Sequence, residues 1–99
     1  MNQEKVGLLA RLEAKAGKEK ELESFLKGAL PLAQQEAFTV SWYAIRLAPN
    51  VFGIFDTFGD ETGRQKHLSG AIASALMAKA SELLANPPQI EKIEILVKK

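Results

Sequence analysis

His67 and Asp56 are the two side chains whose types best suit proton transfer. The chain has no other histidine, and an unperturbed imidazole titrates near neutral pH, so it can act as a base or an acid. A helix-surface or interhelical histidine that is hydrogen-bonded to a neighbouring carbonyl is the structural alternative. Asp56 lies among apolar residues in a strand-like segment, where an ionised carboxylate needs a partner. Arg11 or Arg46 could be that partner across a sheet; otherwise the carboxyl could be a base with a raised pKa beside a pocket.

Four aromatic residues, Trp42, Tyr43, Phe55 and Phe58, are candidates for binding a flat aromatic substrate. Trp42 and Tyr43 are neighbours on a predicted strand, so they point to opposite faces of its sheet and only one can enter a given pocket. Both combine an apolar body with a hydrogen-bond donor, which suits substrate binding and core packing alike. The phenylalanines are expected mainly in the core, with one or two lining a cavity.

Composition excludes several classes of site. The absence of cysteine excludes disulfides, thiolate metal ligands, iron–sulfur clusters and a cysteine nucleophile, and one histidine cannot build a transition-metal site. The glycines form neither a dinucleotide fingerprint nor a phosphate-binding loop. The 13 basic and 12 acidic residues are interspersed, so no nucleic-acid surface is expected. No stretch suits a membrane span or a secretory signal, and we expect a cytoplasmic protein.

Hydrophobic periodicity predicts the elements that must position these residues. Alternating or β-branched segments indicate strands at residues 5–14, 39–47, 51–58 and 90–97. Apolar residues spaced by three and four indicate helices over residues 18–33 and 61–85. Pro31 should kink or break the first helix, and residues 69–70 could divide the second, for which Asp60 is the expected N-cap. Pro49 and Asn50 suit a type I turn, so the second and third strands should form a hairpin.

The order β-α-β-β-α-β predicts one ferredoxin-like α+β domain over residues 1–99. The first and third strands are then central in one antiparallel sheet, and the helices cover one of its faces. These central strands also carry Leu9, Val51 and Phe55 on the second face, although a face open to water would alternate more cleanly. The second face should therefore be covered, most simply by another copy of the chain in a homodimeric α/β barrel. A monomer whose own loops or tail cover the face is the alternative.

Two stretches of the chain resemble the antibiotic-biosynthesis-monooxygenase family. Residues 16–26 are similar to its strand-to-helix entry. The second stretch has three parts. Residues 52–58 resemble the family's hydrophobic strand, which carries an acidic residue and an aromatic residue. Asp60 and Glu61 resemble its following acidic position, and His67-Leu68-Ser69 resemble its later run of His, Leu and a small residue. The sequence departs at Asp56, where the family more often has Glu, and at Phe58, where Tyr or Trp is frequent. The haem-degrading relatives of the fold have Asn and Trp where this chain has Ala10 and Phe58, so haem degradation is not expected.

The resemblance implies a cofactor-independent monooxygenase that oxidises an electron-rich aromatic, such as a quinol or a polyketide-like phenol, with molecular oxygen. The deprotonated substrate would itself reduce oxygen, while the protein supplies an apolar cavity, aromatic walls and a base such as His67 or Asp56. A non-catalytic ligand-binding dimer and an isomerase of small carbonyl compounds are the alternatives, because function belongs to sites and not to folds.

Overall fold

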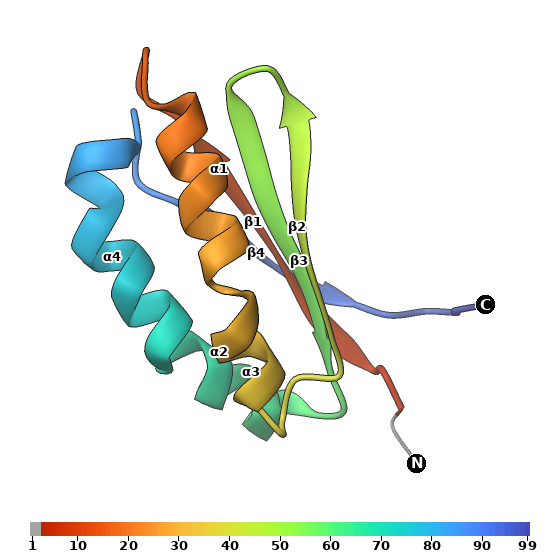
Figure 1. The fold of residues 1–99 in the computed structure, drawn as a ribbon. Coiled ribbons are helices and arrows are strands. Elements are labelled where there is room, and N and C mark those ends of the chain that lie inside the picture. Colours follow the sequence, from red (N-terminus) through yellow and green to blue (C-terminus); the bar gives the residue numbers. More distant parts are fainter. Residues whose placement is uncertain (1–2) are drawn as a thin grey trace.

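In the computed structural model, which describes residues 3–99, the strands form one antiparallel sheet and the helices cover one of its faces (Figure 1). The strands are β1 (Val6–Glu13), β2 (Ser41–Ala48), β3 (Val51–Phe58) and β4 (Gln89–Glu94). The helices are α1 (Glu19–Gly28), α2 (Leu30–Gln35), α3 (Glu61–Leu68) and α4 (Ala71–Leu83). This is the ferredoxin-like α+β architecture expected from the sequence.

The strand order β2-β3-β1-β4 confirms that the first and third strands are central. Leu8 lies opposite Asp56, and Trp42 lies opposite Asp56 on its other side. Because directly paired residues point to the same face of a sheet, these three side chains share the face that the helices cover. Asp56 is thus held in the middle of the sheet, on its buried side.

Both predicted helix interruptions occur. The first helix divides at Ala29, and Pro31 then lies in the first turn of α2, where its missing N–H costs nothing. The second divides at residues 69–70, between α3 and α4. Asp60 is the N-cap of α3, as expected, because its side chain accepts a hydrogen bond of 2.9 Å from the backbone N–H of Gly63.

The core lies between the sheet and the helices. Its most deeply buried apolar residues come from every layer: Leu12, Leu22, Leu26, Phe58 and Ile72. Burial of these side chains, each of which contributes roughly 1.5–3 kcal/mol, holds the helices against the sheet. Among residues 3–99, none of the helices combines the length and the hydropathy that crossing a bilayer requires.

Arg64 ties α3 to the edge of the sheet. Its side chain is largely buried and donates from Nη1 to the carbonyls of Gly7 and Ile93, each at 3.1 Å. It also pairs with Glu61 one turn earlier. Because the two carbonyls belong to β1 and β4, this guanidinium fixes the height of α3 above that strand pair.

The opposite face of the sheet is apolar at its centre. Leu9, Phe55 and Tyr43 lie side by side across β1, β3 and β2, and the rings of Phe55 and Tyr43 stack with centroids 6.0 Å apart. Tyr43 is 54% exposed. All the helices lie on the other side of the sheet (Figure 1), so the helices leave these side chains uncovered, as the sequence predicted.

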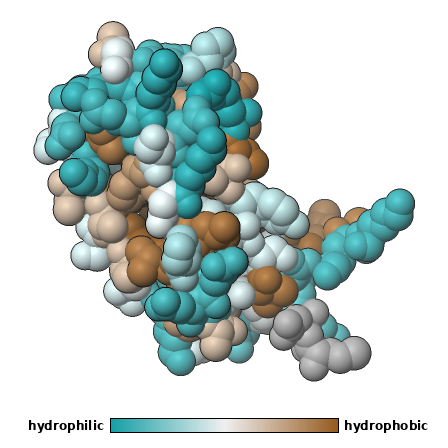
Figure 2. All heavy atoms as spheres, viewed as in Figure 1, coloured by the Kyte–Doolittle hydropathy of each residue, from teal (hydrophilic) through white to brown (hydrophobic). Residues whose placement is uncertain are grey.

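The last strand is shorter than predicted. It ends at Glu94, which pairs with Val6 at the start of β1, and only the backbone N–H of Ile95 finds a further partner, the carbonyl of Lys5. The prediction of a strand to residue 97 was wrong because β1 offers no partner beyond that point. Leu96 and Val97 are 82% and 89% exposed on a narrow C-terminal extension that leaves the body of the molecule (Figure 2).

Candidate acid-base site

His67 lies between two carboxylates, one at each ring nitrogen. Its Nε2 is 2.8 Å from Oδ2 of Asp56, and its Nδ1 is 2.8 Å from Oε1 of Glu36. The exposed fractions of the three side chains are 8% for His67, 1% for Asp56 and 9% for Glu36. We call these three residues the buried triad.

Three separate elements bring the buried triad together. Asp56 is on the helix-facing side of β3, His67 is in the last turn of α3, and Glu36 is the C-cap of α2. The hydroxyl of Thr39 donates to Oε1 of Glu36 at 2.7 Å and holds that carboxylate in place. The ring of Phe58 packs against the imidazole at a centroid distance of 5.3 Å, which shields it from water on that side.

Burial and the two carboxylates act on the imidazole in opposite directions. Burial alone would lower the pKa of His67, but the contacts with Asp56 and Glu36 raise it above its ordinary value. Burial also raises the pKa of Asp56, and the nearby Glu36 adds to this, while the imidazole opposes it. The arrangement therefore favours a charged imidazolium beside a carboxylate that readily accepts a proton.

Asp56 has hydrogen-bonding capacity left over. Its contact with Nε2 is short but not well directed for a hydrogen bond, and neither of its carboxylate oxygens has a well-aligned donor among residues 3–99. Leaving such a buried oxygen unsatisfied costs roughly 1–3 kcal/mol or more. Trp42, its neighbour across the sheet, likewise has a buried Nε1 without a partner in that part of the chain. A site that keeps an unsatisfied carboxylate is suited to a ligand that donates a hydrogen bond.

A small apolar cavity lies directly against Asp56 and His67. Its volume is about 40 Å³, and it is lined by side chains from β1, β3, β4, α3 and α4: Leu8, Ala10, Ile54, Asp56, His67, Leu68, Ile72, Ala73, Leu76 and Ile90. A cavity of about 150 Å³ holds benzene. The cavity at Asp56 therefore admits only a few non-hydrogen atoms unless α4 moves away from the sheet.

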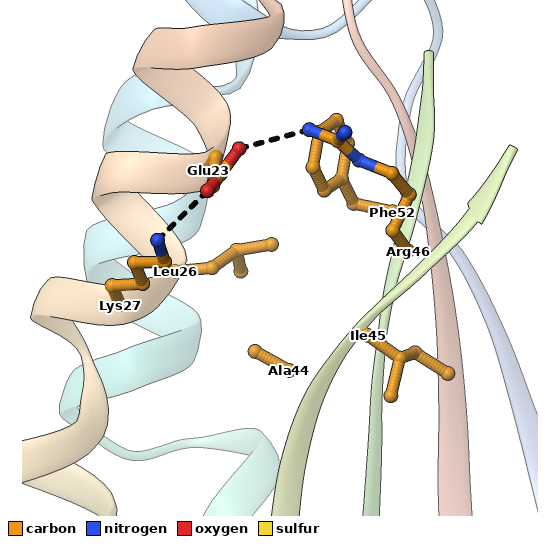
Figure 3. Close-up of a pocket in the computed structure, with 7 residues that line it drawn as sticks. All are labelled: Glu23, Leu26, Lys27, Ala44, Ile45, Arg46 and Phe52. Carbon is orange, nitrogen blue, oxygen red and sulfur yellow. Dashed lines mark hydrogen bonds and ion pairs between the residues drawn. The ribbon is translucent and has the colours of Figure 1, made fainter. Parts of the chain in front are cut away.

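A larger groove lies elsewhere, between α1 and β2. Its volume is about 300 Å³, and Leu26, Ala44 and Phe52 are among its apolar lining residues (Figure 3). Glu23 pairs with both Lys27 and Arg46 at 2.8 Å, as the dashed lines in Figure 3 show. Because these charges are paired on an exposed surface, the groove offers no buried proton acceptor, and the acid-base chemistry belongs to the buried triad.

The predicted partner of Asp56 was wrong. Arg11 instead pairs with Glu91, and Arg46 pairs with Glu23 while its guanidinium lies 4.6 Å from the ring centre of Phe52. Arg11 cannot reach Asp56 because its strand position pairs with Gly53, on the opposite face. Arg46 shares the face of Asp56 but lies opposite Phe52, too far along β3. The true partner is His67, the other proton-transfer candidate.

The aromatic candidates divide between the two faces. Phe58 contacts His67, and Trp42 shares the face of Asp56, where it packs against the hydrophobic core and the cluster of Ala29, Ala33 and Ile72. Tyr43 and Phe55 stack on the outer face instead. The structure thus brings Phe58 and Trp42 to the side of the sheet that holds the cavity, and keeps Tyr43 and Phe55 away from it.

Glu36 was missed by the sequence analysis. A usable signal was present, because Glu36 is the only charged residue between Lys27 and Arg46. An isolated charge in a long uncharged stretch needs a specific partner when the stretch is packed.

The buried triad does not form a metal centre. Each ring nitrogen of His67 faces a different carboxylate, so the three groups do not converge on one point. Residues 3–99 contain no group of three or more His, Cys, Asp or Glu placed to hold a metal ion.

Comparison with solved structures identifies the family. A protein of unknown function from Nitrosomonas europaea is 52% identical, with a TM-score of 0.96 over 100% of this chain and 96% of that one. The chain belongs to the family of that protein. No family model and no curated protein matches the sequence.

More distant members of the fold carry a functional description. A second Nitrosomonas europaea protein and one from Caulobacter crescentus are provisionally described as antibiotic biosynthesis monooxygenases. They are 11% and 19% identical, with TM-scores of 0.83 and 0.79, and the matches cover 97% and 96% of this chain and 94% and 92% of theirs. At such low identity the likeness shows a shared fold. The resemblance seen in the sequence is therefore confirmed for the fold.

Proposed function

We propose that the protein is a cofactor-independent monooxygenase that removes a proton from an electron-rich aromatic, such as a quinol or a polyketide-like phenol, and oxidises it with molecular oxygen. The observation that carries the proposal is the pairing of Asp56 with His67 at the wall of an apolar cavity. The fold that it shares with described monooxygenases supports it further.

In the proposed reaction Asp56 is the base. Its free carboxylate oxygen takes the substrate proton, and the imidazolium of His67 stabilises the negative charge that develops on the substrate. The substrate anion then transfers electrons to oxygen and combines with it. When a phenol is oxidised at a free ring carbon to a quinone, or a quinol to a hydroxyquinone, one oxygen atom enters the product and the other leaves as water with the two hydrogens that the substrate loses, so no separate reductant is required. Phe58 and Trp42 provide aromatic walls on the same side of the sheet.

The volume of the cavity sets a condition on this proposal. An aromatic ring does not fit into about 40 Å³, so α4 must move outward when it binds. The break at residues 69–70 between α3 and α4 is where such a movement can occur. Tyr43 and Phe55 would contribute through the subunit interface proposed below, since they do not face this cavity.

The same small volume favours an isomerase of small carbonyl compounds as the second candidate. A substrate of a few non-hydrogen atoms fits beside Asp56 without displacing α4. Removal of a proton next to the carbonyl by Asp56, and its return at another carbon, uses the same base. The two candidates share their first step and differ in whether oxygen is consumed.

We further propose that two copies of the chain associate through the outer face of the sheet to form a homodimeric α/β barrel. The apolar row of Leu9, Phe55 and Tyr43 supports this, because exposed apolar area costs about 25 cal/mol per Å² relative to burial. In a twofold dimer the same face of each copy contacts the other, so the apolar row of one subunit would cover that of its partner.

Oxygen consumption with a panel of hydroquinones and activated phenols tests the function. We expect turnover by the wild type and a loss of at least roughly a hundredfold in Asp56→Asn. The matched control is Glu82→Gln on the exposed side of α4, which should retain full activity. Turnover that survives Asp56→Asn would remove the assigned base. If no aromatic supports oxygen uptake, exchange of carbonyl-adjacent protons with deuterated water identifies the isomerase, and failure of both assays favours the non-catalytic ligand-binding dimer.

A further inference from the structure

We propose that residues 95–99 form a C-terminal arm that adds a strand to the open edge of β2 in a second copy of the chain. The inference rests on the proposed homodimer and not on the monooxygenase reaction. It assigns a partner to two parts of the molecule that a single chain leaves unpaired, the arm itself and the free edge of β2.

The C-terminal arm is extended and has no strand of its own chain to pair with. It follows β4 and leaves the sheet on the side away from the helices (Figure 1). From Leu96 onward, no backbone N–H has a hydrogen-bond partner among residues 3–99. The side chains of Leu96 and Val97 are almost fully exposed. An extended segment with free backbone groups and apolar side chains is suited to adding a strand to the edge of a sheet.

Two contacts hold the arm to the rest of its chain. The backbone N–H of Ile95 donates to the carbonyl of Lys5 at 3.0 Å. Lys98 pairs with Glu4 at 2.9 Å, so the charge of this lysine is neutralised before any partner binds. Leu96 and Val97, between the two contacts, remain free. An arm that is already held in one direction loses less conformational entropy when it binds.

The two edges of the sheet differ in their protection against pairing. Charged side chains on an edge strand oppose the addition of another strand. Three of the six residues of β4 are charged, Glu91, Lys92 and Glu94, whereas Arg46 is the one charged residue among the eight of β2. The edge of β2 is therefore long and weakly protected, and an edge of this kind is a template for another strand.

The strand order favours an arm and an edge that come from different copies. β2 and β4 lie at opposite edges of the sheet, with β3 and β1 between them. The arm starts from the β4 edge and runs away from the sheet on the side of the apolar row of Leu9, Phe55 and Tyr43 (Figure 1). A second copy that covers this row lies in the direction of the arm. Twofold symmetry makes the exchange mutual, because each copy gives its arm and receives the arm of the other.

Sedimentation equilibrium of the full chain measures the contribution of the arm. Leu96→Ser combined with Val97→Ser should weaken the dimer by at least roughly a hundredfold, because two apolar side chains in each copy lose their contacts. The matched control is Met77→Ser, which removes an exposed apolar side chain from α4 and should leave the dissociation constant unchanged. An unchanged constant in the double variant would overturn the arm. A wild type that stays monomeric at high concentration would overturn the homodimer and the arm together, whereas the oxygen-uptake assay tests the reaction separately.

Cross-linking identifies the edge that receives the arm. The chain has no cysteine, so introduced thiols are the only ones present. A Val97→Cys or Leu96→Cys variant, mixed with variants that carry one cysteine in β2 such as Ile45→Cys, should give disulfide-linked heterodimers, because a disulfide requires Cα atoms within about 7 Å. Met77→Cys in place of the β2 cysteine should give none. Links between two β2 cysteines alone would show that the edges pair directly, and this result, like a dimer without any link between arm and β2, would overturn the proposal.

Discussion

Replacing His67 by leucine should destabilise the fold in a strongly pH-dependent way. The substitution leaves the carboxylates of Asp56 and Glu36 buried near one another without the cation that now touches both at 2.8 Å. Removing one partner of a buried ion pair costs roughly 3–5 kcal/mol. For a domain of this size, each kcal/mol lowers Tm by roughly 4–8 °C, so at pH 7 we expect Tm to fall by at least about 12 °C.

The sign of the pH dependence follows from which state binds more protons. In the His67→Leu variant the folded state has to neutralise its buried carboxyls, so between about pH 4 and neutrality it binds more protons than the unfolded chain. The stability of the variant should therefore fall as pH rises through that range, and the difference from the wild type should shrink near pH 4. In the wild type the raised pKa of His67 means that its stabilisation is complete below about pH 6.5 and is lost as pH rises through the folded-state pKa.

Thermal and urea unfolding at a series of pH values measure this effect. The matched control combines His67→Leu with Asp56→Asn and Glu36→Gln, which removes every charge of the buried triad. This triple variant should recover most of the lost stability and show little pH dependence in the same range, because uncharged packing can replace a buried ion cluster at little net cost. Equal stability of the single variant and the wild type at pH 7, or a parallel pH profile, would refute the ionic description of the site.

Three further changes test other parts of the structure. Leu9→Asp places a charge on the outer sheet face and should give monomers or insoluble protein; an unchanged dimer by light scattering would contradict the proposed interface. Asp60→Ala removes the N-cap bond to Gly63 and should cost about 1 kcal/mol, measured by urea unfolding; no change would show that α3 does not depend on this cap. Hydrogen bonds from Ser41, Thr57 and Lys98 lower the pKa of Glu4 to about 2, so its stabilisation is present above about pH 4.5 and is lost as pH falls toward 2. Glu4→Gln should therefore destabilise the protein at pH 7 and flatten this acid limb, and an unaltered limb would argue against the assignment.

The elements could be predicted from sequence because their signals are local. A proline such as Pro31 interrupts a helix whatever the helix packs against. Asp60 caps α3 through a backbone N–H in the first turn of that same helix. The alternation of residue types along β3 indicates which side chains share a face. The length of β4 was predicted less well, because a strand extends only as far as its neighbour offers partners, and that depends on where β1 begins.

The site could be predicted only in part, because its contacts join distant segments. His67 and Asp56 were found by residue type, but the partner of Asp56 depends on the register between strands, which decides that Arg11 points to the other face. Glu36 lies 31 positions from His67 in the chain, and only the folded chain brings the C-cap of α2 next to the last turn of α3. Residue chemistry therefore identified the participants, while their connections required the fold.

Arg64 connects the helix that carries His67 to the β1–β4 edge of the sheet. Arg64 precedes His67 by three residues, about one helical turn, and donates hydrogen bonds to the carbonyls of Gly7 and Ile93. A molecule that binds along β4, or a strain that slides β4 along β1, would displace the two carbonyls to which Arg64 donates and would thereby tilt α3. The proton-carrying ring would then shift relative to both carboxylates, so that the sheet edge and the interior chemistry would respond to each other.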